Sequence, residues 1–144
     1  MPRKKGSLAH EPVYSPEERK IHLLLKRVGQ DRGRRSEECF FKAFQEDFAK
    51  PVWFERVERS SFREDWLQGI DAWLVTDWGN IPIQIKSSEM AARQFRRRGL
   101  RRVKVIVIDA GDTLAVIRQK LFAVVKGDIW RRSKGHRLSI TVSA

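Results

Sequence analysis

Cysteine and histidine are scarce in this 144-residue chain, which has one cysteine (Cys39) and three scattered histidines (His10, His22 and His136). One cysteine cannot form an intramolecular disulfide, and so sparse a set excludes a Cys/His zinc site. No apolar run approaches the about 20 residues of a membrane-spanning helix, and no apolar signal core follows the basic N-terminus. We therefore expect a cytoplasmic protein in a reducing compartment, with no membrane partner.

Acidic residues are also few relative to basic ones. Eighteen Asp and Glu stand against thirty Lys and Arg, which leaves a formal net charge of +12 and a pI of about 10.6. This balance excludes an acidic protein and makes a polyanion the first partner to consider, ahead of a membrane surface. A chain of this length buries roughly 70% of its unfolded surface on folding, so it can form a core without disulfides or metals.

The sequence indicates a short arm followed by one domain. Residues 1–14 hold Pro, Gly, Lys and Arg without periodicity, and we predict a flexible basic arm there, with a plain disordered tail as the alternative. Residues 15–144 show no repeat and no internal linker, so we expect a single domain over this range.

The first part of this domain is expected to be helical. Ser15 is a good N-cap, and Glu18 completes a capping box with it. An apolar stripe then predicts a helix as far as Gly29, after which the basic segment 32–35 interrupts the pattern. A second helix is predicted over 36–48.

Strands and helices alternate in the remainder. The segment 103–108 is apolar on both faces, as is typical of a central strand covered by helices. Asp112 is expected to cap the last helix, and the alternating Leu138, Ile140 and Val142 favour a C-terminal edge strand. The other expected elements are strands at 52–57, 69–76 and 81–86, a loop at 58–68, a turn at 77–80 and a helix at 88–98. The predicted fold class is therefore α/β, a mixed sheet flanked by helices in the order ααβββαβα.

Glu37 stands out within the second predicted helix. At 100° per residue, Phe41, Phe44 and Phe48 fall within about 40° of it, so its carboxylate shares the apolar, sheet-facing stripe. An inward carboxylate is costly unless something compensates its charge. The alternative is a first-turn Glu that the helix dipole favours and whose head reaches solvent.

Polar side chains also collect on one face of the predicted hairpin. With residues 77–80 as the turn, Asp71 lies opposite Lys86. Trp73 then lies opposite Gln84, and opposed residues point to the same face. Asp71, Gln84 and Lys86 would therefore share that face. The alternative is a solvated face with an ordinary Asp–Lys pair. Trp73 lies on the same face, however, and its large apolar side chain favours a face that a helix covers.

These residues resemble the signature of the PD-(D/E)XK nuclease superfamily. The run GID at 69–71 is followed, after twelve residues, by QIKS at 84–87, which is similar to the paired motif of that superfamily. The run RGRRSE at 32–37 resembles the start of the glutamate-bearing helix in Holliday junction resolvases. The resemblance extends over about 32–108 and implies a restriction endonuclease-like fold.

The resemblance implies a role for each residue of the motif. Asp71 would be the main metal-binding carboxylate, and Glu37 would complete the site from its helix. Lys86 would orient or activate the attacking water and offset charge in the transition state. The Gln84 side chain and the main-chain carbonyl of Ile85 would be further oxygen ligands, and hard oxygen ligands suit Mg²⁺ or Mn²⁺.

Gln84 departs from the family pattern, because most members carry Glu or Asp at that position. An amide oxygen can still bind a metal, and similar Gln variants occur in methylation-dependent restriction nucleases. A site with two carboxylates carries a charge of about −2 rather than −3, so we expect weaker metal binding. Glu64 and Asp65, in the predicted loop, are reserve candidates for the site.

Basic residues are dense directly after the motif strand. If they only formed a solvated helix face, alternating acids would be expected, and Glu89 is the one acid nearby. A nucleic-acid interface is therefore favoured, in which phosphate contacts position the DNA. The predicted DNA contacts are Arg34, Arg35, Ser87, Arg93, Arg96, Arg97, Arg98, Arg101 and Arg102.

The sequence thus favours a Mg²⁺- or Mn²⁺-dependent DNA endonuclease, which by the resemblance would leave a 5′-phosphate and a 3′-hydroxyl. Duplex or branched DNA, such as a junction, is the expected partner. A homodimer joined through the first helix or the C-terminal strand would let it cut two strands. Two alternatives stay open. One is the same fold with a weakened site that binds DNA without cutting, which Gln84 favours; the other is a basic RNA-binding protein without nuclease ancestry.

Overall fold

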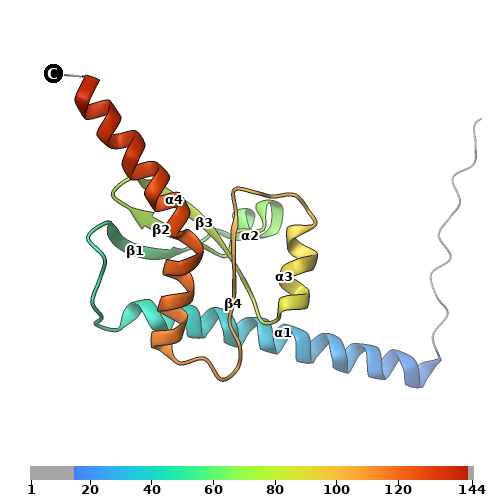
Figure 1. Cartoon of the computed structure of the whole chain (residues 1–144). Helices are drawn as coiled ribbons and strands as arrows, with labels where there is room; N and C mark the ends of the chain where they lie inside the picture. Colours follow the sequence, from blue (N-terminus) through green and yellow to red (C-terminus); the bar gives the residue numbers. More distant parts are fainter. Residues whose placement is uncertain (1–14, 143–144) are drawn as a thin grey trace, which may run out of the picture. The chain divides into compact units, whose positions relative to one another are not determined.

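The computed structural model describes residues 15–142 and has a mixed α/β architecture. Four strands form one sheet in the order β1-β2-β3-β4, with helices beside it (Figure 1). The chain divides into two compact units, residues 1–31 and 32–144, and the whole sheet belongs to the second. The elements are α1 (Pro16–Gln45), β1 (Phe54–Arg59), α2 (Phe62–Gln68), β2 (Ala72–Thr76), β3 (Gly79–Lys86), α3 (Glu89–Arg96), β4 (Lys104–Val107) and α4 (Leu114–Val142).

The first helix is continuous, so the predicted division into two helices at 32–35 is wrong. Most of the supposed interruption is Arg, a good helix former, and Gly33 costs only about 1 kcal/mol relative to Ala inside a helix. The capping box at the start is confirmed. The Glu18 N–H donates to the Ser15 hydroxyl at 3.2 Å, and the Ser15 N–H donates to the Glu18 carboxylate at 2.7 Å.

The sheet is mixed, as predicted, with β1, β2 and β3 antiparallel and β4 parallel to β3. Trp73 pairs with Pro82 rather than with Gln84, so the predicted hairpin register is wrong. The reason is the turn, which spans only residues 77–78 because Thr76 already pairs with Gly79. The slip covers an even number of residues, so the side chains keep the faces that the sequence predicts.

The segment 58–68, predicted to be a loop, contains the helix α2. Its N-cap Ser61 accepts a hydrogen bond from the Glu64 N–H, and the Glu64 carboxylate accepts one from the Ser61 N–H, which completes a capping box. Gly69 ends the helix in the left-handed conformation, with φ of 63°.

The last helix also differs from its prediction at both ends. Thr113 rather than Asp112 caps it, because the Val116 N–H donates to the Thr113 hydroxyl at 3.2 Å. At the other end α4 continues to Val142, so the predicted C-terminal edge strand is wrong. No proline follows Pro82 in the sequence, so no proline ring interrupts the helix, which continues through Gly127 and Gly135.

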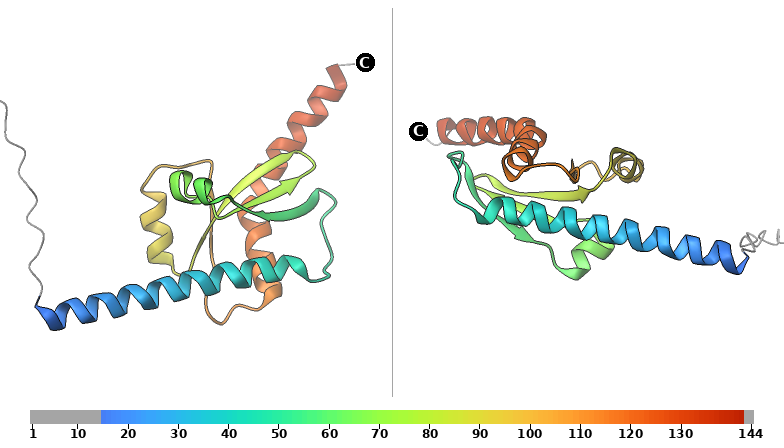
Figure 2. Two further views of the ribbon diagram at one scale, coloured as in Figure 1. Left: turned by 180° about the vertical axis from the view of Figure 1, so that it is seen from behind. Right: turned by 90° about the horizontal axis from the view of Figure 1, so that it is seen from below.

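The core lies between the sheet, α4 and the part of α1 that belongs to the second unit. Ile117, Leu121 and Val125 follow one face of α4 and are fully buried, and Phe40 of α1 is fully buried with them. Burying one such side chain contributes roughly 1.5–3 kcal/mol. The strand β4 is apolar on both faces, as predicted, and lies between α3 and α4 (Figure 2). Its residues divide between the two clusters, Val105 and Val107 with α3, and Ile106 with α4.

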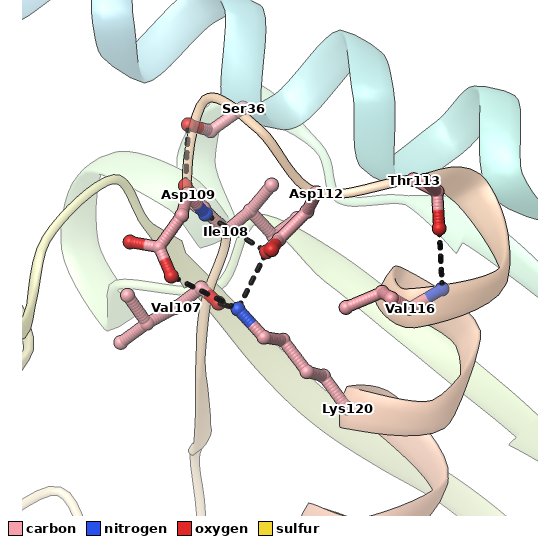
Figure 3. A network of polar contacts seen from close by, with 8 residues as sticks. All are labelled: Ser36, Val107, Ile108, Asp109, Asp112, Thr113, Val116 and Lys120. Atoms are coloured by element: carbon pink, nitrogen blue, oxygen red, sulfur yellow. Dashed lines mark hydrogen bonds and ion pairs between the residues drawn. The ribbon is translucent and has the colours of Figure 1, made fainter.

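A polar network closes the connection between β4 and α4 (Figure 3). Lys120 forms ion pairs with Asp109 and Asp112, and the Asp109 N–H donates to the Asp112 carboxylate at 2.9 Å. Burial disfavours the charge of Lys120, but its hydrogen bonds to Asp112 and Asp109 outweigh burial and raise its pKa. Beside the network, the Ser36 hydroxyl donates to the carbonyl of Ile108 at 3.4 Å, which ties α1 to the end of β4.

We expect Lys120→Met to lower the free energy of unfolding by about 1–2 kcal/mol, because partly buried acceptors lose a charged donor. Lys120 donates to the Val107 carbonyl at 3.0 Å and to the largely buried carboxylate of Asp112, as well as to the exposed carboxylate of Asp109. Urea unfolding measures the loss. The matched control is Lys126→Met, at an exposed lysine of the same helix, with an expected change within about 0.5 kcal/mol. Equal losses in the two variants would contradict a stabilising role for the network.

The first half of α1 carries exposed apolar side chains. Ile21, Leu24, Leu25 and Val28 follow the i, i+3, i+4, i+7 spacing, and each is about half or more exposed. These four residues are called the α1 apolar stripe below. Neither α1 nor any other helix within residues 15–142 is long and apolar enough to cross a membrane.

Candidate functional site

Asp71 lies directly before β2, where its main chain and side chain both bond to β3. The Asp71 N–H donates to the Ile83 carbonyl at 2.9 Å, and the Asp71 carboxylate accepts the Ile85 N–H at 2.7 Å. The side chain is buried, with the residue 8% exposed. These two bonds lie on either side of Gln84 in the chain. Asp71 therefore lies beside the segment 83–85 and not opposite Lys86 as predicted.

Gln84 presents a buried oxygen with no partner. The residue is 6% exposed, and its Oε1 atom accepts no hydrogen bond from the described residues. Gln84 pairs with Val105 of β4, so its side chain lies on the face of the sheet that α3 covers. Leaving such an acceptor buried and unpaired costs about 1–3 kcal/mol. That cost is recovered if a ligand or a metal ion binds this oxygen.

Phe95 of α3 positions the candidate lysine. The Nζ atom of Lys86 lies 5.3 Å from the centre of the Phe95 ring, and the Arg98 guanidinium lies 5.4 Å from it. Gly69 packs against the same ring, since a Cβ atom there would be 2.7 Å from Cε2 of Phe95. The ring thus brings Lys86 next to the chain that leads into Asp71.

Glu37 is half-buried on α1, and the charges of its neighbours shift the pKa of its carboxyl. Burial raises the pKa of the Glu37 carboxyl, the charge of Asp65 raises it further, and the charges of Arg59 and Lys86 lower it. The inward carboxylate that the helix periodicity predicts is therefore compensated in part by two cations. Arg59 is held in turn by Phe41, whose ring centre lies 3.9 Å from the guanidinium.

Burial raises the pKa of the Asp71 carboxyl to about 7, against an ordinary value of 3.8. The hydrogen bond from the Ile85 N–H acts in the other direction, while the charge of Glu37 and a hydrogen bond with Asp65 raise the pKa. Glu37 of α1 and Asp65 of α2 thus both favour the protonated form of the Asp71 carboxyl. It holds a proton for a large part of the time at neutral pH.

The available donors suit a hard divalent cation in kind, because all of them are oxygens. Within residues 15–142, no three His, Cys, Asp or Glu side chains gather closely enough to hold a metal ion by themselves. A metal at Asp71 and Glu37 would therefore also need Oε1 of Gln84 and the main-chain carbonyl of Ile85. The Ile85 carbonyl points to the same side of β3 as its N–H, which is the side of Asp71.

Asp65, a reserve candidate from the sequence, lies beside Asp71 and raises the pKa of its carboxyl. It lies on α2 rather than in a loop, and the spacing of Ser61 and Glu64 before Gly69 was the available signal for that helix. Glu64 itself turns away, because its carboxylate accepts the Trp73 indole N–H at 2.8 Å. Arg59 had no local signal, since only the tertiary fold brings β1 to α1.

The predicted DNA contacts are dispersed over several elements. Those on α1, on α3 and in the segments that follow α3 are exposed, and Ser87 is half-buried after β3. Arg96 is partly compensated by Glu89, at 3.8 Å. The exposed members are Arg34, Arg35, Arg93, Arg96, Arg97, Arg98, Arg101 and Arg102.

Arg101 and Arg102 line a cleft of about 1040 Å³ beside the part of β3 that extends past β4. We call it the basic cleft. Its wall also includes Arg131 and Arg132 of α4, which the sequence does not connect with the motif because they are remote from it in the chain. Trp73 contributes an aromatic side chain to the same wall.

Comparison with known protein families, with curated proteins and with solved structures found no match for this chain. Membership of the PD-(D/E)XK superfamily, and the restriction endonuclease-like form of the mixed α/β fold, therefore stay predictions. They rest on the residues of the motif and on their arrangement in space.

Proposed function

We propose that this protein is a Mg²⁺- or Mn²⁺-dependent DNA endonuclease, similar to the PD-(D/E)XK nucleases. The observation that carries the proposal is the buried Oε1 of Gln84, which has no hydrogen-bond partner in the described part of the chain and is flanked by the two residues that bond to Asp71. Glu37 and Lys86 interact electrostatically at the same place. A buried acceptor beside carboxylates is unfavourable unless a cation balances it.

Asp71, Glu37, Gln84 and the carbonyl of Ile85 would hold the ion. A bound divalent ion supplies Lewis-acid polarisation of the phosphate and a more acidic water. The neutral amide of Gln84 keeps the charge of the donor set low. We therefore expect modest metal affinity, in keeping with the departure of Gln84 from the family pattern.

Lys86 carries the positive charge that the reacting phosphate needs. Its ammonium group, placed by the Phe95 ring, would offset the negative charge that builds up on the phosphate oxygens. Lys86 would also orient or activate the attacking water, as the resemblance to the PD-(D/E)XK nucleases implies. In the hydrolysis, the oxygen of the attacking water bonds to phosphorus, and the bond between phosphorus and the 3′-oxygen breaks. The water loses a proton, and the leaving 3′-oxygen gains one. The products are a 5′-phosphate and a 3′-hydroxyl.

DNA, as duplex or branched molecules, is the proposed substrate, and a homodimer is the proposed active form for cutting two strands. The α1 apolar stripe supports the first helix as the dimer interface, because four neighbouring apolar side chains are exposed there. The C-terminal strand is no longer a candidate, since that segment is helical.

We expect the purified protein to nick supercoiled plasmid DNA in the presence of Mn²⁺. Asp71→Ala and Lys86→Ala should each lower the rate by at least about 100-fold, the scale seen when one electrostatic contributor is removed. Exposed residues of the same types, Asp77→Ala and Lys126→Ala, are the matched controls and should cleave like the unchanged protein. Gel electrophoresis of timed samples measures the rate.

Cleavage that survives both site substitutions would overturn the proposal. Absence of cleavage by the unchanged protein, with DNA binding retained, would point instead to the binding module without activity. Binding of RNA in preference to DNA would favour the third candidate, a basic RNA-binding protein.

A further inference from the structure

The basic cleft is a strongly charged concave surface that the proposed chemistry does not use. Five cationic side chains line it, against the single acid Asp128. Lys104 forms an ion pair with Asp128 at 3.1 Å, and Arg131 pairs with the same carboxylate. One carboxylate cannot neutralise the whole set, so the cleft keeps a net positive charge. The five cations are Arg101, Arg102, Lys104, Arg131 and Arg132.

Arg101 and Arg102 are the cations available to a ligand. Both are exposed, and within the described residues neither side chain has a hydrogen bond or an ion pair. Their loop is ordered by main-chain bonds, from the Arg101 N–H to the Gly99 carbonyl at 2.9 Å and from the Val103 N–H to the Leu100 carbonyl at 3.1 Å. Two free guanidinium groups on a fixed loop suit the planar, two-point recognition of phosphate.

The opposite wall is rigid because its polar groups are already bonded. Arg132 donates to the carbonyls of Trp78 at 3.1 Å and Asn80 at 3.4 Å, which fixes α4 against the hairpin. The Trp73 indole N–H is held by Glu64 at 2.8 Å. The indole ring is therefore a fixed aromatic surface beside the guanidinium groups.

The cleft begins next to the candidate site. Pro82 lines the cleft, and Gln84 lies two residues further along the same strand, about 7 Å at the usual rise of a strand. Ile70, the residue before Asp71, lines it as well. A polymer held at the site would therefore enter this cleft with its next units.

We infer that the basic cleft binds a single strand of nucleic acid that continues from the phosphate at the candidate site. The inference deepens the proposed nuclease function and rests on it for the position of the strand. The cleft volume is close to that of small-ligand pockets, about 300–1,000 Å³, which suits a short stretch of one strand better than a duplex. Free guanidinium groups for phosphates beside an aromatic surface for bases are the usual elements of single-strand binding.

The test is fluorescence anisotropy with a labelled single-stranded oligonucleotide in EDTA, where no metal-dependent cleavage can occur. We expect the double variant Arg101→Ala/Arg102→Ala to bind at least about tenfold more weakly. The slope of log K against log salt should also fall by about 1.4, because each phosphate contact on a single strand contributes about 0.7. The matched control is Lys42→Ala/Lys126→Ala, which removes the same charge from exposed positions outside the cleft and should bind within about twofold of the unchanged protein.

Two outcomes would overturn the inference. One is an equal loss of binding in both double variants, because net charge alone would then explain it. The other is competition by polyglutamate as effective as that by the unlabelled oligonucleotide, which would identify an acidic protein as the partner.

A duplex of the same sequence should lose less affinity than the single strand in the Arg variant. The binding assay needs no metal. If single-strand binding behaves as expected but the protein does not cleave DNA in Mn²⁺, the nuclease proposal is refuted and the inference about the basic cleft is not.

Discussion

Replacing Asp71 by Asn is expected to stabilise the protein at pH 8 while it abolishes the proposed metal-dependent cleavage. Burial raises the pKa of Asp71 to about 7 from 3.8, so the folded state binds this proton more tightly than the unfolded state does. Stability therefore falls as the pH rises from about 4 to about 7, and the full cost remains above pH 7. A shift of about three units corresponds to roughly 4 kcal/mol as an upper bound. Asn removes the charge and keeps an oxygen to accept the Ile85 N–H.

The measurement is urea unfolding of both proteins in EDTA at several pH values. We expect Asp71→Asn to exceed the unchanged protein by about 2–4 kcal/mol at pH 8, and the difference to close near pH 4. Asp77→Asn, at an exposed position of the turn, is the control and should show no such pH-dependent difference. A variant that is less stable than the unchanged protein at pH 8 would contradict a buried carboxylate of raised pKa.

Replacing Gln84 by Glu is expected to have opposite effects with and without metal. A third carboxylate beside Asp71 and Glu37, at a position only 6% exposed, adds buried charge of the same sign. Without metal we expect the melting temperature to fall by several degrees, which corresponds to about 1–2 kcal/mol. With Mn²⁺ the added charge becomes a ligand, so affinity should rise by about tenfold or more.

Thermal melts in EDTA and in Mn²⁺, together with titration calorimetry, measure both effects. The control is Gln119→Glu, the same change of side chain at an exposed position of α4, which should change neither metal affinity nor the melting temperature appreciably. Unchanged Mn²⁺ affinity in Gln84→Glu would show that Gln84 is not a ligand, and the donor set proposed above would then be wrong.

Periodic features of the fold could be predicted from the sequence, and connections between elements could not. The face of each β2 and β3 side chain follows from alternation, which a slip of two residues does not change, so the faces were right while the Trp73 pairing was wrong. The continuity of α1 was missed because Gly33 and its Arg neighbours interrupt the apolar pattern without breaking the backbone. α2 was missed although Ser61 and Glu64 form the spacing of a capping box.

The candidate site shows the same division. The sequence places Glu37 inward and keeps Gln84 and Lys86 on one face, because both statements depend only on helix and strand periods. It does not bring Arg59 toward Glu37 or Arg132 to the hairpin, since those neighbours come from distant parts of the chain. The basic cleft therefore became visible only in three dimensions.

Gly69 limits how this chain can diverge. Its φ of +63° strains any larger residue, and a Cβ atom would lie 2.7 Å from Cε2 of Phe95, so a substitution here also requires the Phe95 ring to move. This packing constraint does not depend on the proposed cleavage, so glycine is favoured here for as long as an aromatic ring fills the opposite position. Distant relatives are therefore better sought by this glycine–aromatic pair than by the acidic signature.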